Sequence, residues 1–116
     1  MATWTGSWRN QYGSVVTLEE DGERLSGTFR TALDDSGFFG RDYDVVGTCH
    51  GDCIAFAFAG GTPKGDMVCA FTGVLRAGRL ETVWHVVSDQ ATEGDGKRAW
   101  PHAVMTNADT FERVSE

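Results

Sequence analysis

The chain has 116 residues, which suffice for one domain around a single hydrophobic core and leave no room for a second core. Its 15 glycines, 2 prolines and many β-branched or aromatic residues favour strands joined by tight turns over helices. The net charge of −7, with scattered Lys and Arg, argues against a nucleic-acid-binding surface, and no apolar run approaches the roughly 18 to 20 residues of a membrane-spanning helix.

Turn residues divide the chain into short strand-like runs, and no long helical periodicity interrupts them. Asp21-Gly22 and Arg76-Ala77-Gly78 are hairpin signals, the glycine-rich segment 60–66 is read as a loop, and 34–42 and 89–99 are read as longer connections. The expected strands are 4–10, 15–18, 25–33, 43–49, 53–59, 67–75, 79–88 and 102–114.

Eight strands in sequential hairpins predict an all-β fold, an eight-stranded antiparallel up-and-down β-barrel that occupies residues 1–116 as a single domain. A closed barrel of this size is just wide enough to hold one small ligand.

Alternating side chains indicate which strand faces point inward. In 53–59 the large residues Ile54, Phe56 and Phe58 share one face, and alanines occupy the other. In 79–88 both faces are partly apolar, because Val83 and Val87 lie opposite the face of Trp84. An outer face of small and apolar residues predicts a homo-oligomer, and the pattern does not distinguish a dimer from a tetramer.

The three cysteines are too few for a disulfide scaffold. Cys49 and Cys53 flank His50-Gly51-Asp52, which reads as a three-residue turn, so either a hairpin disulfide or reduced thiols fit this segment. Its spacing matches no standard zinc pattern, even with His102, and no metal site is expected. The N-terminus lacks the basic start and long apolar segment of a signal peptide.

Five segments, in order and at compatible spacing, together resemble the avidin/streptavidin family over nearly the whole chain. They are Thr5–Ser14 (TGSWRNQYGS), Leu25–Ala32 (LSGTFRTA), Phe71–Gly73 (FTG), Thr82–Trp84 (TVW) and Asn107–Phe111 (NADTF). The resemblance implies a secreted, non-enzymatic barrel that binds biotin as a ligand and uses no other cofactor.

The resemblance also assigns ligand contacts to individual positions. Asn10 and Ser14 match donors to the ureido oxygen of biotin, and Thr31 and Asp109 match acceptors of its N–H groups. A charged acceptor strengthens such a hydrogen bond. Trp84 matches a tryptophan that walls the bicyclic ring, and Trp100 matches one that reaches into a neighbour's site. The other positions that the resemblance places around the ligand are Tyr12, Phe29, Leu33, Asp35, Phe58, Cys69, Phe71 and Val86.

Several positions depart from the family pattern. Phe29 stands where the family has a tyrosine donor, the strand-five tryptophan falls on Gly60, and the strand-six tryptophan is Phe71. Cys69 and about Met67 replace a threonine and a serine that contact the sulfur and the carboxylate. The connection after strand three is longer than in the family and carries Asp34, Asp35, Phe38 and Phe39. We therefore expect the affinity for biotin to be clearly lower than that of the tightest-binding members of the family.

Two other functions fit the same residues. The barrel could bind a different apolar small molecule, since Gly60, Cys69 and Met67 would make one end of the ligand cavity wider and less polar. It could also be a small enzyme in which Asp109 acts as general base and Cys69 as nucleophile. The second alternative is disfavoured because His85 lies on the strand face opposite Trp84, so no Cys–His pair forms inside.

Overall fold

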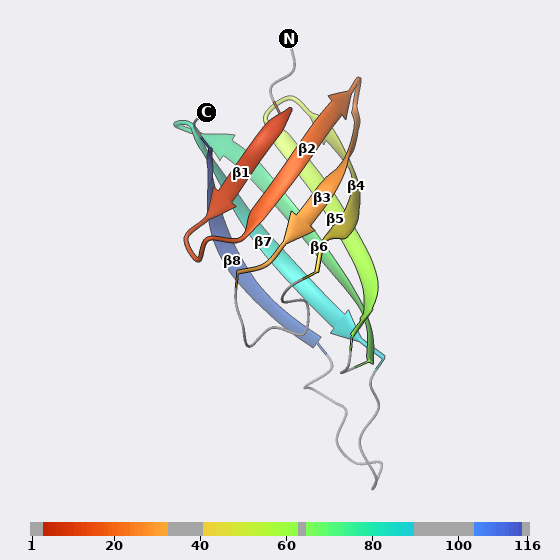
Figure 1. Ribbon diagram of the computed structural model, residues 1–116. Coiled ribbons are helices and arrows are strands. Elements are labelled where there is room, and N and C mark those ends of the chain that lie inside the picture. Colours follow the sequence, from red (N-terminus) through yellow and green to blue (C-terminus); the bar gives the residue numbers. More distant parts are fainter. Residues whose placement is uncertain (1–3, 33–40, 63–64, 90–103, 115–116) are drawn as a thin grey trace, which may run out of the picture.

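The structure, a computed structural model, describes residues 4–32, 41–62, 65–89 and 104–114. Its eight strands form one closed antiparallel barrel, which confirms the predicted fold class (Figure 1). Within the described residues no helix is long and apolar enough to cross a membrane. The strands are β1 (Gly6–Asn10), β2 (Val15–Asp21), β3 (Arg24–Arg30), β4 (Tyr43–His50), β5 (Cys53–Thr62), β6 (Gly65–Arg76), β7 (Arg79–Ser88) and β8 (Val104–Arg113).

Each strand pairs with the next in the chain, and β8 returns to pair with β1. Because the strands alternate in direction, successive connections lie at opposite ends of the barrel (Figure 1). At the end that we call the terminal end, β1 begins and β8 finishes. At the opposite end, the loop end, β3 leads into β4 and β7 leads into β8 through the two longest connections.

A packed aromatic cluster closes the terminal end. The rings of Trp4 and Trp8 lie 5.8 Å apart, and the Trp8 indole nitrogen donates a 3.0 Å hydrogen bond to the Trp4 carbonyl. The guanidinium of Arg113 lies 4.4 Å from the Trp8 ring centroid, a cation–π contact. Leu80 and Phe111 are fully buried in the same core. This end therefore consists of packed side chains that satisfy their own polar groups.

The predicted inward face of β5 is confirmed. Ile54, Phe56 and Phe58 are buried, whereas the alanines between them are at least partly exposed. The outward face of β4, β6 and β7 carries four large exposed hydrophobic residues, Val46, Val68, Val83 and Val87. These four valines, which we call the outer apolar stripe, therefore face solvent.

The expected loop at 60–66 is wrong. The β5–β6 ladder continues through Gly60↔Met67 and Gly61↔Asp66 to Thr62↔Gly65, so both strands extend toward the loop end. Glycine weakens a strand but does not stop it, and here cross-strand pairing outweighs the local propensity. Other strand ends shift by a few residues, as β1 begins at Gly6 and β3 ends at Arg30.

The hairpin between β4 and β5 also differs from the expectation. Gly51 and Asp52 form a two-residue turn, which pairs His50 with Cys53. A shift of one residue moves a side chain to the other sheet face, so Cys49 is buried and Cys53 is exposed. The two thiols therefore point to opposite sides of the sheet, and all three cysteines are free.

The turn between β6 and β7 offers a test of this architecture. Ala77 (φ 51°) and Gly78 (φ 79°) both adopt the left-handed backbone conformation. Alanine is strained there, whereas Asn-Gly is the preferred pair for a two-residue hairpin turn. We predict that Ala77→Asn raises the free energy of unfolding by about 0.5 to 1 kcal/mol, measured by urea denaturation. Ala77→Val, with a β-branched side chain, should lower it; an Ala77→Asn variant that is less stable than wild type would contradict the assigned turn.

Candidate functional site

Five polar side chains are buried among the described residues, and they gather where β1, β3, β7 and β8 approach one another through the barrel interior. They are Asn10, Ser14, Thr31, Thr82 and Asp109. Buried polar groups are costly unless they are hydrogen-bonded, so their pairing shows what the interior is built to present.

Two side-chain amides at the end of strand β1 bind the carboxylate of Asp109. Asn10 Nδ2 donates to Asp109 Oδ2 at 3.0 Å, and Gln11 Nε2 lies 3.4 Å from Asp109 Oδ1. The Oδ1 atom of Asn10 accepts the backbone N–H groups of Tyr12 (3.0 Å) and Ser14 (2.9 Å), which fixes the orientation of the amide. Asn10 therefore keeps one amide proton, and Asp109 keeps lone pairs, for a further partner.

Ser14 and Thr31 form the second half of the group. Their hydroxyl oxygens lie 3.2 Å apart, and the Ser14 Oγ atom accepts the backbone N–H of Ala32 at 2.8 Å. Ser14 has a single hydroxyl proton. When Thr31 donates to Ser14, that proton can point to a bound molecule, and a lone pair of Thr31 can accept from it.

These hydrogen bonds link Asp109 through Asn10 and Ser14 to Thr31, and we call these four residues the polar row. The two residues at its ends, Asp109 and Thr31, can accept hydrogen bonds, and the two in the middle, Asn10 and Ser14, can donate them. The row therefore complements a group in which a carbonyl stands between two N–H donors.

Stacked aromatic rings form the interior wall next to the polar row. Phe29 stacks on Phe58 and Phe56 stacks on Phe71, each pair with ring centroids 4.7 Å apart. Phe71 also lies 6.4 Å from the ring of Trp84. Such a wall suits an apolar, flat ligand ring.

Tyr43 covers the position where the family pattern has its strand-five tryptophan. A Cβ atom built on Gly60 would lie 2.3 Å from Tyr43 Cε1, so the tyrosine ring occupies the space over this glycine. The ring is 5.4 Å from that of Phe58. The contact depends on the β4–β5 register, and local sequence gives no signal for it.

The structure brings most of the sequence-predicted residues to one interior face. Asn10, Ser14, Phe29, Thr31, Phe58, Cys69, Phe71 and Asp109 are buried, and Trp84 and Val86 are partly buried on the inward face of β7. Tyr12 is 52% exposed on the β1–β2 turn and contributes its backbone N–H to Asn10. Gln11, Tyr43 and Thr82 are interior or network residues that the sequence analysis missed. Leu33, Asp35 and Trp100, with Asp34, Phe38 and Phe39, lie outside the described residues.

Cys69 contributes a neutral thiol to the interior. Burial, and to a lesser extent the charge of Asp109, raises the pKa of the Cys69 thiol to about 12. Cys69 therefore stays protonated at ordinary pH. No cluster of three or more His, Cys, Asp or Glu side chains suited to a metal ion occurs in the described part of the chain.

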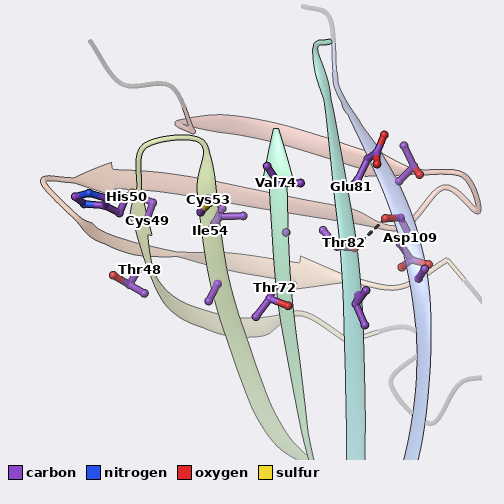
Figure 2. A pocket seen from close by; sticks show the side chains of 15 residues that line it. Thr48, Cys49, His50, Cys53, Ile54, Thr72, Val74, Glu81, Thr82 and Asp109 are labelled. Carbon is purple, nitrogen blue, oxygen red and sulfur yellow. Dashed lines mark hydrogen bonds between the residues drawn. The ribbon is translucent and has the colours of Figure 1, made fainter. Parts of the chain in front are cut away.

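A separate groove of about 780 Å³ lies across β4 to β8 on the outside of the barrel (Figure 2). Its lining includes the outward-facing residues Thr48, Ala55, Thr72, Val83 and Thr110. At one side of it, Thr82 Oγ1 donates to the backbone carbonyl of Asp109 at 2.9 Å, the dashed line of Figure 2. Val83 of the outer apolar stripe lines this groove, beside polar residues such as Thr48 and Glu81.

Comparison with known proteins gives a consistent result. The model of the Avidin family matches residues 1–114. A rhizavidin–biotin complex has a TM-score of 0.78 and 22% sequence identity, and the match covers 97% of this chain and 92% of that one. A complex of short afifavidin with biotin has a TM-score of 0.76 and 27% identity, with 97% and 90% covered. None of the curated proteins matches the chain.

The burial of Cys69 predicts a large difference in thiol reactivity. At pH 8 about one Cys69 thiol in ten thousand is ionised, given the pKa of about 12, and only the thiolate reacts. The exposed Cys53 should react rapidly with a thiol reagent in the native protein, and Cys69 should react after unfolding in guanidinium. Cys53→Ser should remove the rapid phase, and rapid labelling of Cys69 in that variant would contradict the buried placement.

Proposed function

The chain belongs to the avidin family, and we propose that it is a biotin-binding protein that holds the urea group of biotin on the polar row. The observation that supports this proposal is the order of acceptors and donors from Asp109 to Thr31. The relatives whose structures contain biotin, rhizavidin and short afifavidin, add weight to it.

Each side of the urea group has a partner in the proposed complex. The ureido oxygen accepts the remaining amide proton of Asn10 and the hydroxyl proton of Ser14. One ureido N–H donates to Asp109 and the other to Thr31. The carboxylate gives the stronger of these bonds, since charge-assisted hydrogen bonds are about twice as strong as neutral ones.

The apolar rings of biotin lie, in this proposal, against Phe71, Phe58 and Trp84. Tyr12, Leu33, Asp35, Val86 and Trp100 complete the proposed contacts around the ligand. Phe29 lacks a hydroxyl, and the loss of one donor to a buried acceptor costs about 1 to 3 kcal/mol. We therefore propose weaker binding than the family's best, partly offset by Tyr43 over Gly60.

We propose binding rather than catalysis. A nucleophilic cysteine needs a lowered pKa or an adjacent base, whereas burial raises the pKa of Cys69 to about 12. His85 is exposed on the outer face of β7 and His50 is exposed at the terminal end of β4. Neither histidine faces the interior thiol.

We also propose that the outer stripe is where two copies of the chain associate. Val68 on β6 pairs with Val87 on β7, and Val83 lies on the same outward face of β7. Val46, on β4, is separated from them by β5, where it pairs with Ala57. An exposed apolar patch is typical of an interface, and a two-fold axis would bring the same patch of two copies together.

Asp109→Asn tests the proposed ligand contact. Calorimetric titration of wild type should show biotin binding, and the variant should bind about 10- to 100-fold more weakly, since it replaces a charged acceptor with a neutral one. Asp44→Asn is a matched control, because Asp44 is exposed on the outward face of β4. The absence of both heat and thermal shift with millimolar biotin in wild type would overturn the proposed function.

Val83→Arg tests the proposed association. Light scattering after size exclusion should give an oligomer for wild type and a monomer for the variant, because the arginine places a charge on the apolar stripe. The same change at Thr17, which is exposed on β2 away from this stripe, should leave the oligomer intact. A wild-type chain that elutes as a monomer at micromolar concentration would refute the interface.

A further inference from the structure

The indole nitrogen of Trp84 is a buried polar atom with no hydrogen-bond partner among the residues that the structure describes. The Trp84 side chain as a whole is partly exposed, so the nitrogen is buried although part of the ring reaches solvent. Trp8 gives the contrast, because its indole nitrogen donates to the Trp4 carbonyl at 3.0 Å. Native proteins rarely leave a buried donor unmatched, and an unmatched one inside a ligand site indicates a ligand acceptor.

The strand register places Trp84 beside the polar row, on the side toward the loop end. Thr82 pairs with Asp109, and Trp84 is the next inward-facing residue along β7, about 7 Å further on. Its cross-strand neighbour on β6 is Phe71, which has no donor. Cys69, the next inward-facing residue on β6 toward the loop end, has a thiol, which is a weak donor. The indole is therefore a well-placed donor for this part of the ligand.

We propose that Trp84 Nε1–H donates a hydrogen bond to an acceptor atom of the ligand that lies beyond its urea group, and that in biotin this atom is the ring sulfur. The proposal rests on the proposed function. Biotin has two fused five-membered rings, with the ureido carbonyl at one end and the sulfur at the other. When the carbonyl lies on the polar row, the sulfur extends toward the layer of Trp84.

A comparison of two ligands in two proteins separates this hydrogen bond from the packing of the indole ring. Desthiobiotin keeps the urea group and the carboxylate tail of biotin but lacks the sulfur. Trp84→Phe removes the N–H group together with part of the ring, and the lost packing weakens both ligands. Calorimetry should show that Trp84→Phe weakens biotin about three- to tenfold more than it weakens desthiobiotin. Trp8→Phe, at the terminal end, should weaken the two ligands equally.

The indole N–H can also be observed directly in the wild-type protein. In a proton–nitrogen correlation spectrum, with signals assigned from Trp8→Phe and Trp84→Phe, biotin should shift the Trp84 indole signal and desthiobiotin should shift it less. The Trp8 signal should stay in place with both ligands. The shift itself is measured in the wild-type protein, and the variants serve only to assign the signals.

The outcomes distinguish the two proposals. Equal weakening of biotin and desthiobiotin by Trp84→Phe, with equal indole shifts, would overturn the sulfur contact and leave biotin binding established. The absence of biotin binding in wild type would overturn the proposed function, and the sulfur contact with it. A larger effect on biotin in both measurements supports the contact.

Discussion

The barrel closes where its first and last strands meet, and the remaining features of the molecule depend on this junction. Three residue pairs join β1 to β8, from Trp8↔Arg113 to Asn10↔Phe111. Side chains reinforce these pairs, since Asn10 and Gln11 bind Asp109, and Gln11 Oε1 accepts the backbone N–H of Thr110 at 3.0 Å. The junction that closes the sheet thus also builds the polar row. A ligand that bridges Asn10 and Asp109 would link the two ends of the fold, and its binding energy would add to the stability of the barrel.

Aromatic packing around the polar row follows from the same closed sheet. Inward positions on neighbouring strands lie at one level, so Phe56, Phe71 and Trp84 meet although they are far apart in the chain. A change at one strand can therefore be compensated from another. Gly60 leaves a space on β5, and Tyr43 fills it from β4. The wall is a property of the assembled barrel rather than of any one strand.

Local sequence was sufficient to predict the fold class and the inward face of β5, because large and small residues alternate along that strand. It was insufficient where cross-strand pairing determines strand ends and turn lengths. Segment 60–66 has the composition of a loop, yet its residues continue the β5–β6 ladder. The turn after His50 is one residue shorter than expected, which separates Cys49 from Cys53. Asn10, Ser14 and Asp109 were found through a family resemblance, while the contacts of Gln11 and Tyr43 depend on long-range register that no local pattern records.

The neighbouring positions of Gly6 and Arg113 have a practical consequence. Because β1 begins and β8 finishes at the terminal end, both strands leave the barrel away from the connections that surround the opposite end (Figure 1). A fusion partner or a solid support attached through either strand would extend from the sealed side. The molecule is thus suited to immobilisation with its loop end facing the solution, where a small molecule can approach it.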